Sequence, residues 1–454
     1  MRTRLCIPML AAALAAAATF VARADAPGVY AIRGARIVTA AGAPIESGTV
    51  VIRHGLIEAV GAGVTVPADA WVIEGAGLTV YPGLIDMGTA TGIDAPSAPQ
   101  PQDPQTTEEV ERWKRSVILR PHLKAANHVA TESADLHKFV SAGVTTVLAR
   151  PAGAGIAGWS ALLNVVPPDD APQIGGVADV RSGLLVVRDD VALHVALERP
   201  PGGGGYPVSQ MGLIAFVRQA FLDGQHYGLA RQRDARTASG PQRPAYDPSL
   251  EALAPALGGR LPVAFRAGLS REIRRALKMA AEFELDPIIT GALEADQVAA
   301  ELKARNARVV YSLNYPTRPK TLAPDADEPL RVLRQRANAP KVPAALETAG
   351  VLFAFESVGL TDPKAFLKNA AQAVKEGLPP DAAIRALTIN AARIAGAADR
   401  LGSLEAGKIA NVIVTDGDLF GDETKIRHVF VDGRLVRIEE AEASPQPNRR
   451  GRGF

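Results

Sequence analysis

The sequence predicts an α/β fold, in which a (β/α)8 barrel of the TIM type is joined to a small β-sandwich built from both ends of the chain. The length of 454 residues suffices for one large domain and a smaller one. Eight apolar segments with the length of buried strands recur between residues 80 and 355, and helical patterns follow several of them. Short alternating strands with tight turns occupy both ends of the chain.

The N-terminus has the pattern of a secretory signal peptide. A basic start with Arg2 and Arg4 precedes an apolar, alanine-rich run from Leu5 to Val21, and Ala22-Arg-Ala24 provides a cleavage site. We predict removal of residues 1–24, or cleavage after Ala26. The alternative is an N-terminal membrane anchor, but the apolar run is short for a bilayer span. A periplasmic or secreted protein with no membrane span after cleavage is therefore expected.

Charge and cysteine content limit the functions of the mature chain. The predicted signal peptide contains three arginines, no acidic residue and the only cysteine, Cys6. Without it, 47 basic side chains stand against 48 acidic ones, which does not favour nucleic-acid binding. The mature chain has no thiol for a disulfide, a thiolate metal site or a cysteine nucleophile.

Residues 25–80 and 403–438 are predicted to form the β-sandwich together. Neither end has enough strands for a core of its own. Asp432-Gly433 is a strong two-residue hairpin signal in the C-terminal part. The expected strands are Ala31–Thr39, Gly48–Arg53, Leu56–Val60, Trp71–Glu74, Asn411–Thr415, His428–Val431 and Arg434–Ile438.

Residues 81–402 are predicted to form the barrel. Ser270 and Asp381 are expected to be the N-caps of two amphipathic helices. Ala230–Pro248 is predicted as a loop and residues 439–454 as a disordered tail. The expected barrel strands are Val80–Asp86, Thr145–Ala149, Gly183–Val187, Val191–Leu197, Pro262–Phe265, Pro287–Ile289, Val309–Leu313 and Val351–Phe355.

Two stretches resemble the amidohydrolase superfamily, most closely its imidazolonepropionase-like branch. The run Pro82-Gly-Leu-Ile-Asp86 is similar to the end of the family's first barrel strand, where His-x-His follows. Ala386–Ile394 and Gly402–Val414 resemble the family's last barrel helix and its return to the sandwich. The resemblance implies metal-assisted hydrolysis of non-peptide C–N bonds, with a divalent ion, usually zinc, that activates a bound water.

The positions of the family's metal ligands hold other residue types in this chain. Glycine and alanine have no side-chain donor, and the guanidinium of Arg266 would repel a cation. His194 is the only histidine in a predicted barrel strand, and a lone histidine there is more often a packing residue. We therefore predict no metal cofactor and a catalytically impaired enzyme. The substituted positions are Gly88, Ala90, Arg266, Thr290 and Val358, with Glu356 as the alternative to Val358.

Polar residues at the carboxyl ends of the predicted strands are candidates for a retained pocket. They are Asp86, Arg150, Arg266, Thr290 and Glu356. The two arginines favour a small anionic ligand such as a carboxylate, although ion pairs within the barrel mouth would explain the same residues.

Two other functions remain open. A rewired hydrolase would use Asp86, His194 and Glu356 to bind one ion or to act as general acid and base. A non-catalytic partner would form a homodimer, or a heterodimer with a catalytically intact relative.

Overall fold

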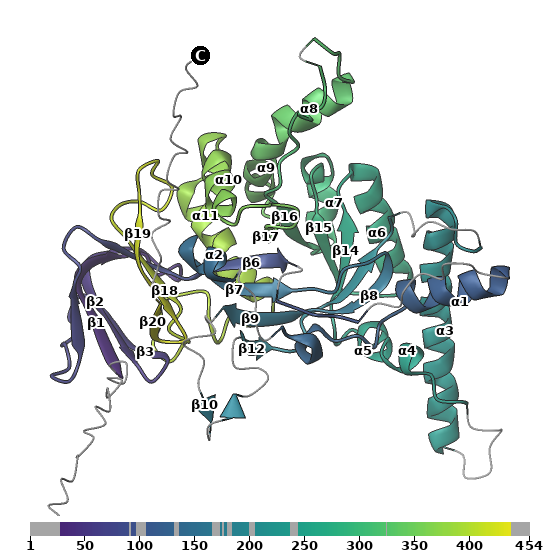
Figure 1. Cartoon of the computed structure of the whole chain (residues 1–454), viewed down its shortest axis with the longest axis horizontal. Coiled ribbons are helices and arrows are strands. Elements are labelled where there is room, and N and C mark those ends of the chain that lie inside the picture. The colour runs from purple at the N-terminus through teal and green to yellow at the C-terminus, as the bar shows by residue number, and fades with distance from the viewer. Residues whose placement is uncertain are drawn as a thin grey trace, which may run out of the picture.

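The computed structural model describes residues 28–89, 92–96, 106–130, 136–165, 173–174, 177–178, 184–198, 205–236, 244–323 and 325–436. The predicted signal peptide, the predicted tail and Ala90 lie outside these residues. The described strands form sheets of eight, six, four and two strands, with helices packed around the six-stranded sheet (Figure 1). The fold is thus a mixed α/β fold.

Both ends of the chain contribute to the eight-stranded sheet (Figure 1). Strand β18 runs antiparallel to β5, with Ile413 opposite Tyr81, so the two ends are hydrogen-bonded to each other. A single sheet is observed, and a sandwich of two packed sheets is not confirmed. Its strands are β1 (Val29–Ile37), β2 (Ile45–Arg53), β3 (Leu56–Gly61), β4 (Trp71–Glu74), β5 (Thr79–Pro82), β18 (Val412–Thr415), β19 (Ile426–Val431) and β20 (Arg434–Val436).

The predicted barrel strands divide between two sheets. In the six-stranded sheet, five strands run parallel in the order of the sequence, and β8 runs antiparallel at one edge. This sheet contains β8 (Gly155–Trp159), β13 (Leu193–Ala196), β14 (Val263–Ala267), β15 (Pro287–Gly291), β16 (Arg308–Ser312) and β17 (Phe353–Glu356). The four-stranded sheet contains β6 (Leu84–Thr89), β7 (Val144–Ala149), β9 (Ala161–Val165) and β12 (Leu184–Arg188).

The prediction of a closed (β/α)8 barrel is not met, because the ladders of the described residues leave two separate sheets. The predicted third strand, Gly183–Val187, is observed as β12, but it runs antiparallel to β9 at a sheet edge. Its expected place between β7 and β13 is taken by β8 and β9, which only Ser160 separates and which the sequence analysis missed.

The reason that β8 escaped prediction is its glycine content. Gly155 and Gly158 have φ angles of +71° and +130°, which favour glycine. A Cβ atom at either position would also collide with a backbone oxygen, that of Ile118 or of Leu123. Sequence patterns normally assign such glycines to loops, whereas here they let the strand pass close to neighbouring backbone.

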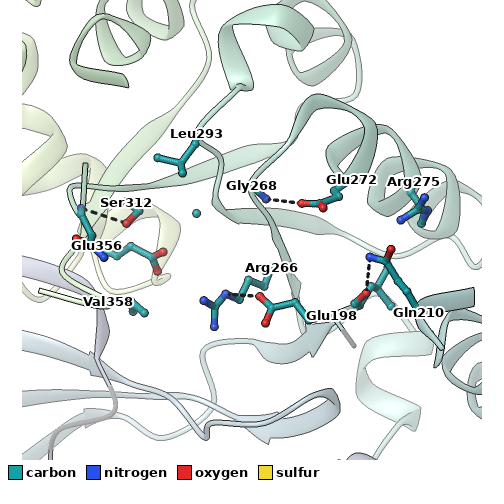
Figure 2. Close-up of a pocket in the computed structure, with 13 residues that line it drawn as sticks. Glu198, Gln210, Arg266, Gly268, Glu272, Arg275, Leu293, Ser312, Glu356 and Val358 are labelled. Carbon is teal, nitrogen blue, oxygen red and sulfur yellow. Dashed lines mark hydrogen bonds and ion pairs between the residues drawn. The ribbon is translucent and has the colours of Figure 1, made fainter. Parts of the chain in front are cut away.

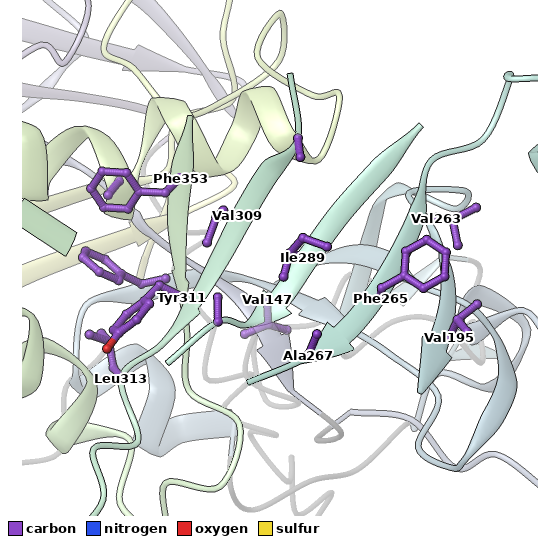
Figure 3. Close-up of a cluster of buried hydrophobic side chains, with 14 of the residues drawn as sticks. Val147, Val195, Val263, Phe265, Ala267, Ile289, Val309, Tyr311, Leu313 and Phe353 are labelled. Atoms are coloured by element: carbon purple, nitrogen blue, oxygen red, sulfur yellow. The ribbon is translucent and has the colours of Figure 1, made fainter. Parts of the chain in front are cut away.

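Alternate residues of the parallel strands face two different cores. Side chains on the outer face pack under the helices, and they include Phe265, Ile289 and Tyr311 (Figure 3). Side chains on the inner face form a second cluster, which includes Ala264, Ile288, Val310 and Ala354. Because both faces are buried, the strands are continuous apolar runs in the sequence, which is why they could be located.

The α-helices surround these sheets, and none of those in the described residues has the length and apolar composition needed to cross a membrane. They are α1 (Thr107–Ile118), α2 (Leu136–Ser141), α3 (Gln210–Arg236), α4 (Pro248–Glu251), α5 (Ala254–Leu257), α6 (Ser270–Glu282), α7 (Ala299–Ala304), α8 (Leu330–Asn338), α9 (Val342–Thr348), α10 (Lys364–Lys375), α11 (Pro380–Leu387) and α12 (Ile389–Ile394). Short 3₁₀ helices are η1 (Ala125–His128), η3 (Ala295–Val298) and η4 (Ala339–Lys341).

Three local predictions about helices were wrong. The predicted loop Ala230–Pro248 begins inside α3, which continues to Arg236. Ser270 is the first residue of α6 and Leu269 is its N-cap. Asp381 lies in the first turn of α11, whose N-cap is Pro379, and it pairs with Arg385 one turn later. Proline is favoured at the first helical position because its fixed φ angle suits the start of a helix, and Pro380 at this position places Asp381 inside the first turn.

A buried asparagine joins the eight-stranded sheet to the four-stranded one. The side-chain amide of Asn411 donates to Thr146 Oγ1 at 2.9 Å and to Asn164 Oδ1 at 2.8 Å. Its oxygen accepts a hydrogen bond from the backbone N–H of Asp432 at 2.8 Å. Only an amide can donate two hydrogen bonds and accept one at this position, so Asn411 fixes how the chain ends attach to β7 and β9.

We expect Asn411→Ala to lower the free energy of unfolding by about 2–4 kcal/mol, because it leaves several buried polar groups without partners. Urea denaturation measures this change. Gln372→Ala is the control, since Gln372 is exposed and bonds only weakly to Glu376 at 3.3 Å. Equal stability of the two variants would show that the junction does not depend on Asn411.

Candidate functional site

The inner face becomes polar where the parallel strands end. Each of these strands carries a polar residue two positions after its residue in the apolar cluster of the inner face. The polar residues are Arg266, Thr290, Ser312 and Glu356. Because side chains alternate along a strand, they share the inner face with that cluster. In the sheet, Arg266 is opposite Thr290 and Ser312 is opposite Glu356. Four neighbouring strands therefore place a polar layer at their carboxyl ends.

A cavity of about 390 Å³ opens at this layer, and we call it the mouth pocket. Figure 2 shows Glu356, Ser312 and Val358 at one end, Gln210 and Arg275 at the other, and Arg266 with Glu198 between them. The lining residues are Leu197, Glu198, Gln210, Arg266, Gly268, Glu272, Arg275, Gly291, Leu293, Ser312, Asn314, Glu356 and Val358.

Glu356 is a buried acid with an unused oxygen. Its exposed fraction is 4%, and Oε2 has no hydrogen-bond partner among the described residues. Burial raises the pKa of Glu356 to about 7, the nearby Asp86 raises it further, and Arg150 and Arg266 act in the opposite direction. The carboxyl group therefore changes its charge near neutral pH.

Gly88 provides the space for the Glu356 carboxyl group. A Cβ atom at position 88 would lie 2.5 Å from Glu356 Oε2 and 3.1 Å from Glu356 Cβ. A side chain at position 88 and the observed position of Glu356 thus exclude each other. Gly88 was predicted to be a substituted ligand position. Its lack of a side chain also leaves room for the carboxyl group of Glu356.

Asp86 is committed to the backbone and does not line the mouth pocket. Its Oδ1 accepts hydrogen bonds from the N–H groups of Gly88 at 3.1 Å and Ser357 at 2.8 Å, and Oδ2 accepts one from Ser357 Oγ at 2.5 Å. Burial raises the pKa of Asp86 to about 6, although these hydrogen bonds oppose the shift. Asp86 therefore connects β6 to the residues that follow β17.

Arg150 and His194 are absent from the lining of the mouth pocket. Burial is the main influence on the pKa values of Asp86, Glu356 and His194, and the charge of Arg150 lowers all three. The pKa of His194 is lowered to about 3, so its imidazole is neutral at physiological pH. Within the described residues, Arg150 Nε and His194 Nε2 are buried without a hydrogen-bond partner.

Arg266 is in the mouth pocket, but its charge is balanced. Its Nε lies 2.8 Å from Oε1 of Glu198, and both side chains are about half exposed. The predicted preference for an anion at Arg266 is weakened accordingly. Thr290 is buried and contributes to the inner layer, but it is not in contact with the cavity.

Several lining residues were missed by the sequence analysis. Glu198 directly follows the predicted strand Val191–Leu197, so the rule that selected Arg266 could have found it. Gln210, Glu272 and Arg275 come from the starts of α3 and α6, and nothing in their local sequence indicates a site. Arg275 lies six residues into α6 and lines the mouth pocket.

The described residues do not offer a ligand set for a divalent ion. No three His, Cys, Asp or Glu side chains of this part of the chain come together in the way a metal site requires. Asp86 already accepts three hydrogen bonds, and Arg266, Thr290 and Val358 provide no imidazole or carboxylate. Ala90 lies outside the described residues. The donors that a catalytic metal needs are therefore not assembled around Glu356.

Comparison with known proteins relates the fold to that of amidohydrolases. The amidohydrolase family model matches residues 290–436, which include β16 and β17. An amidohydrolase from Thermotoga maritima superposes with a TM-score of 0.70 at 21% identity, covering 90% of this chain and 99% of the other. The fold is that of an amidohydrolase.

Two prolidases have the same fold at lower similarity. A prolidase solved with N-methylphosphonate-L-proline gives a TM-score of 0.52 at 19% identity, covering 90% of this chain and 99% of the other. A putative prolidase from Bifidobacterium longum gives 0.51 at 18% identity, covering 90% and 95%. No curated protein sequence matches the chain. The imidazolonepropionase-like branch is not confirmed.

The close approach of Gly88 and Glu356 predicts a coupled pair of mutations. Gly88→Ala should destabilise the protein by about 1–3 kcal/mol, because the new methyl group overlaps the Glu356 side chain. In a Glu356→Ala background the same change should cost much less, which a double-mutant cycle by urea denaturation measures. Additive effects of the two substitutions would contradict the arrangement.

The raised pKa of Glu356 predicts a specific dependence of stability on pH. Between the ordinary glutamate pKa of 4.5 and about 7, the folded protein binds more protons at Glu356 than the unfolded chain. The free energy of unfolding therefore falls as the pH rises through this window, and the loss is complete above the folded pKa.

Glutamine at position 356 does not ionise, so the Glu356→Gln variant should not show this loss. The difference in unfolding free energy between variant and wild type should shift in favour of the variant by on the order of 2 kcal/mol from about pH 5 to about pH 8. Urea denaturation at the two pH values measures the gain. Asp86 and His194 titrate in both proteins and cancel in the comparison. A difference that does not vary with pH would show that Glu356 ionises normally.

Proposed function

We propose that this protein is a metal-independent member of the amidohydrolase fold group that binds a small polar molecule in the mouth pocket. The observation that carries this proposal is the position of Glu356. Its buried carboxyl group occupies the space above Gly88, next to strand ends that carry arginine, threonine and valine in place of metal ligands. On this proposal the family's metal-bound water is not formed, and metal-assisted hydrolysis has been lost.

The lining favours a ligand with an amine, amide or carbonyl group at one end and a carboxylate at the other. The free Oε2 of Glu356 can accept a hydrogen bond from an amine or amide, or the protonated acid can donate one to a carbonyl. At the other end, Arg275 lines the cavity and forms no ion pair or hydrogen bond with other described residues, so it can bind a carboxylate. An amino-acid derivative combines both groups, in keeping with the prolidases that share the fold.

This ligand differs in one respect from the small anion expected from the sequence. Arg266 already has Glu198 as its partner, so a purely anionic ligand would meet three lining glutamates and only one free guanidinium, that of Arg275. A carboxylate remains part of the proposed ligand, but it is directed to Arg275.

A second function is favoured by the properties of Glu356. A pocket-lining carboxyl group with a pKa of about 7 suits a general base. Glu356 would take a proton from water, the water oxygen would attack the carbonyl carbon of an amide, and the same proton would pass to the leaving nitrogen. Asp86 and His194 would not share this role, because Asp86 is bound to the backbone and His194 does not line the pocket.

Metal analysis and turnover measurements separate the two functions. We expect the purified protein to contain far less than one divalent ion per chain, and added zinc or manganese to produce no hydrolysis of dipeptides, N-acyl amino acids or cyclic amides. Metal-free hydrolysis that Glu356→Gln abolishes would establish the second function. Glu301→Gln, on the exposed side of α7, is the matched control.

One ion per chain together with turnover would overturn the proposal of a metal-independent protein. Secretion, and association as a homodimer or with a metal-binding relative, remain proposals that rest on the N-terminal sequence and on the loss of ligand residues.

A further inference from the structure

Helix α8 projects from the body of the protein (Figure 1), and several of its residues line a second cavity. It has a volume of about 710 Å³, and we call it the α8 groove. Leu293, which follows β15, lines both this cavity and the mouth pocket, so the two cavities adjoin each other. The groove is lined by Leu293, Glu294, Gln297, Leu330, Arg331, Arg334, Gln335, Ala337, Asn338 and Lys341.

The basic residues of α8 fall into two groups. Arg336 belongs to the fold, because its Nη2 and the Nη1 of Arg318 lie 2.6 Å and 2.9 Å from the carboxylate of Glu328. Arg331 and Arg334 line the groove instead, one turn apart. Neither has an ion pair or hydrogen bond with another residue that the structure describes. Two guanidinium groups are therefore available on the same side of the groove.

The other charged groups of the groove do not neutralise these arginines. The carboxylate of Glu294 accepts hydrogen bonds from the backbone N–H and the hydroxyl of Ser270, at 2.9 Å and 3.2 Å. Lys341 adds a third positive charge and contacts Glu376 only at 4.0 Å. The groove thus has an excess of positive charge, which attracts an anion into a concave surface.

The groove also has an apolar side. Leu330 is 59% exposed, and it faces the cavity together with Leu293 and Ala337. Pairs of guanidinium groups bind carboxylates and phosphates through charge-assisted hydrogen bonds, and exposed leucines bind hydrocarbon. We propose that the α8 groove binds an amphipathic molecule, whose carboxylate or phosphate group is held by Arg331 and Arg334 and whose apolar part lies against Leu330 and Leu293.

This proposal does not depend on the function of the mouth pocket. Pyrophosphate, tricarballylate and octyl phosphate are suitable probes. None of them carries the amine or amide that would bind Glu356, and any binding of their anionic groups to Arg275 would not respond to substitution of Arg331 and Arg334. Calorimetric titration of the full-length protein measures their affinity at low ionic strength. Pyrophosphate and tricarballylate distinguish a phosphate site from a carboxylate site.

We expect Arg331→Gln/Arg334→Gln to weaken binding of the preferred oxyanion by about tenfold or more. The control is Arg271→Gln/Lys278→Gln, which removes two exposed charges from α6 outside the groove and should alter the affinity less than about twofold. Leu330→Ser should weaken octyl phosphate and leave pyrophosphate unchanged, because only octyl phosphate has an apolar part.

Failure of all three probes to bind the wild-type protein would overturn the proposal. So would equal effects of the groove and control variants, or an octyl phosphate affinity that Leu330→Ser does not change. Glu356→Gln should leave binding of all probes intact. These outcomes are separate from those of the metal analysis, which tests the mouth pocket.

Discussion

A buried carboxylate connects the edge strand β6 of the four-stranded sheet to the end of β17, the edge strand of the six-stranded sheet. Asp86 in β6 accepts hydrogen bonds from the backbone N–H and the hydroxyl of Ser357, just after β17. An ionised carboxyl group is costly to bury, and these bonds offset part of that cost. The positions of Gly88 and Glu356 follow from this contact, because each residue lies within two positions of it in the sequence.

The described residues around the mouth pocket carry charged groups but no set of metal ligands. Two buried carboxyl groups, Asp86 and Glu356, remain near each other, and the positive charge that acts on both comes from Arg150, with Arg266 also acting on Glu356. Arginine supplies a permanent charge, but it cannot lower the pKa of a bound water as a zinc ion does. Charged side chains therefore act on one another in this region, while the donor set for metal chemistry is absent from the described residues.

The alternation of buried side chains explains why the strands could be located from the sequence and their arrangement could not. All eight predicted segments are strands, because runs such as Val309–Leu313 are apolar on both faces. The predicted strand order was wrong because it omitted β8 and β9. The glycines of β8, Gly155 and Gly158, are required by the close approach of the backbone at Ile118 and Leu123, which the local sequence does not reveal. The start of α11 was also predicted wrongly, because Pro380 occupies its first position and places Asp381 inside the helix.

The sequence by itself determined which residue types stand at the strand ends, because Pro82–Asp86 and the apolar runs locate those ends without coordinates. It therefore identified Arg266 and Glu356 as residues of the mouth. Tertiary structure decided what these residues do. The ion pair of Arg266 with Glu198, the commitment of Asp86 to Ser357 and the unpaired arginines of α8 all depend on contacts between segments far apart in the chain. Charge balance and hydrogen-bond satisfaction are properties of such contacts, and no local pattern contains them.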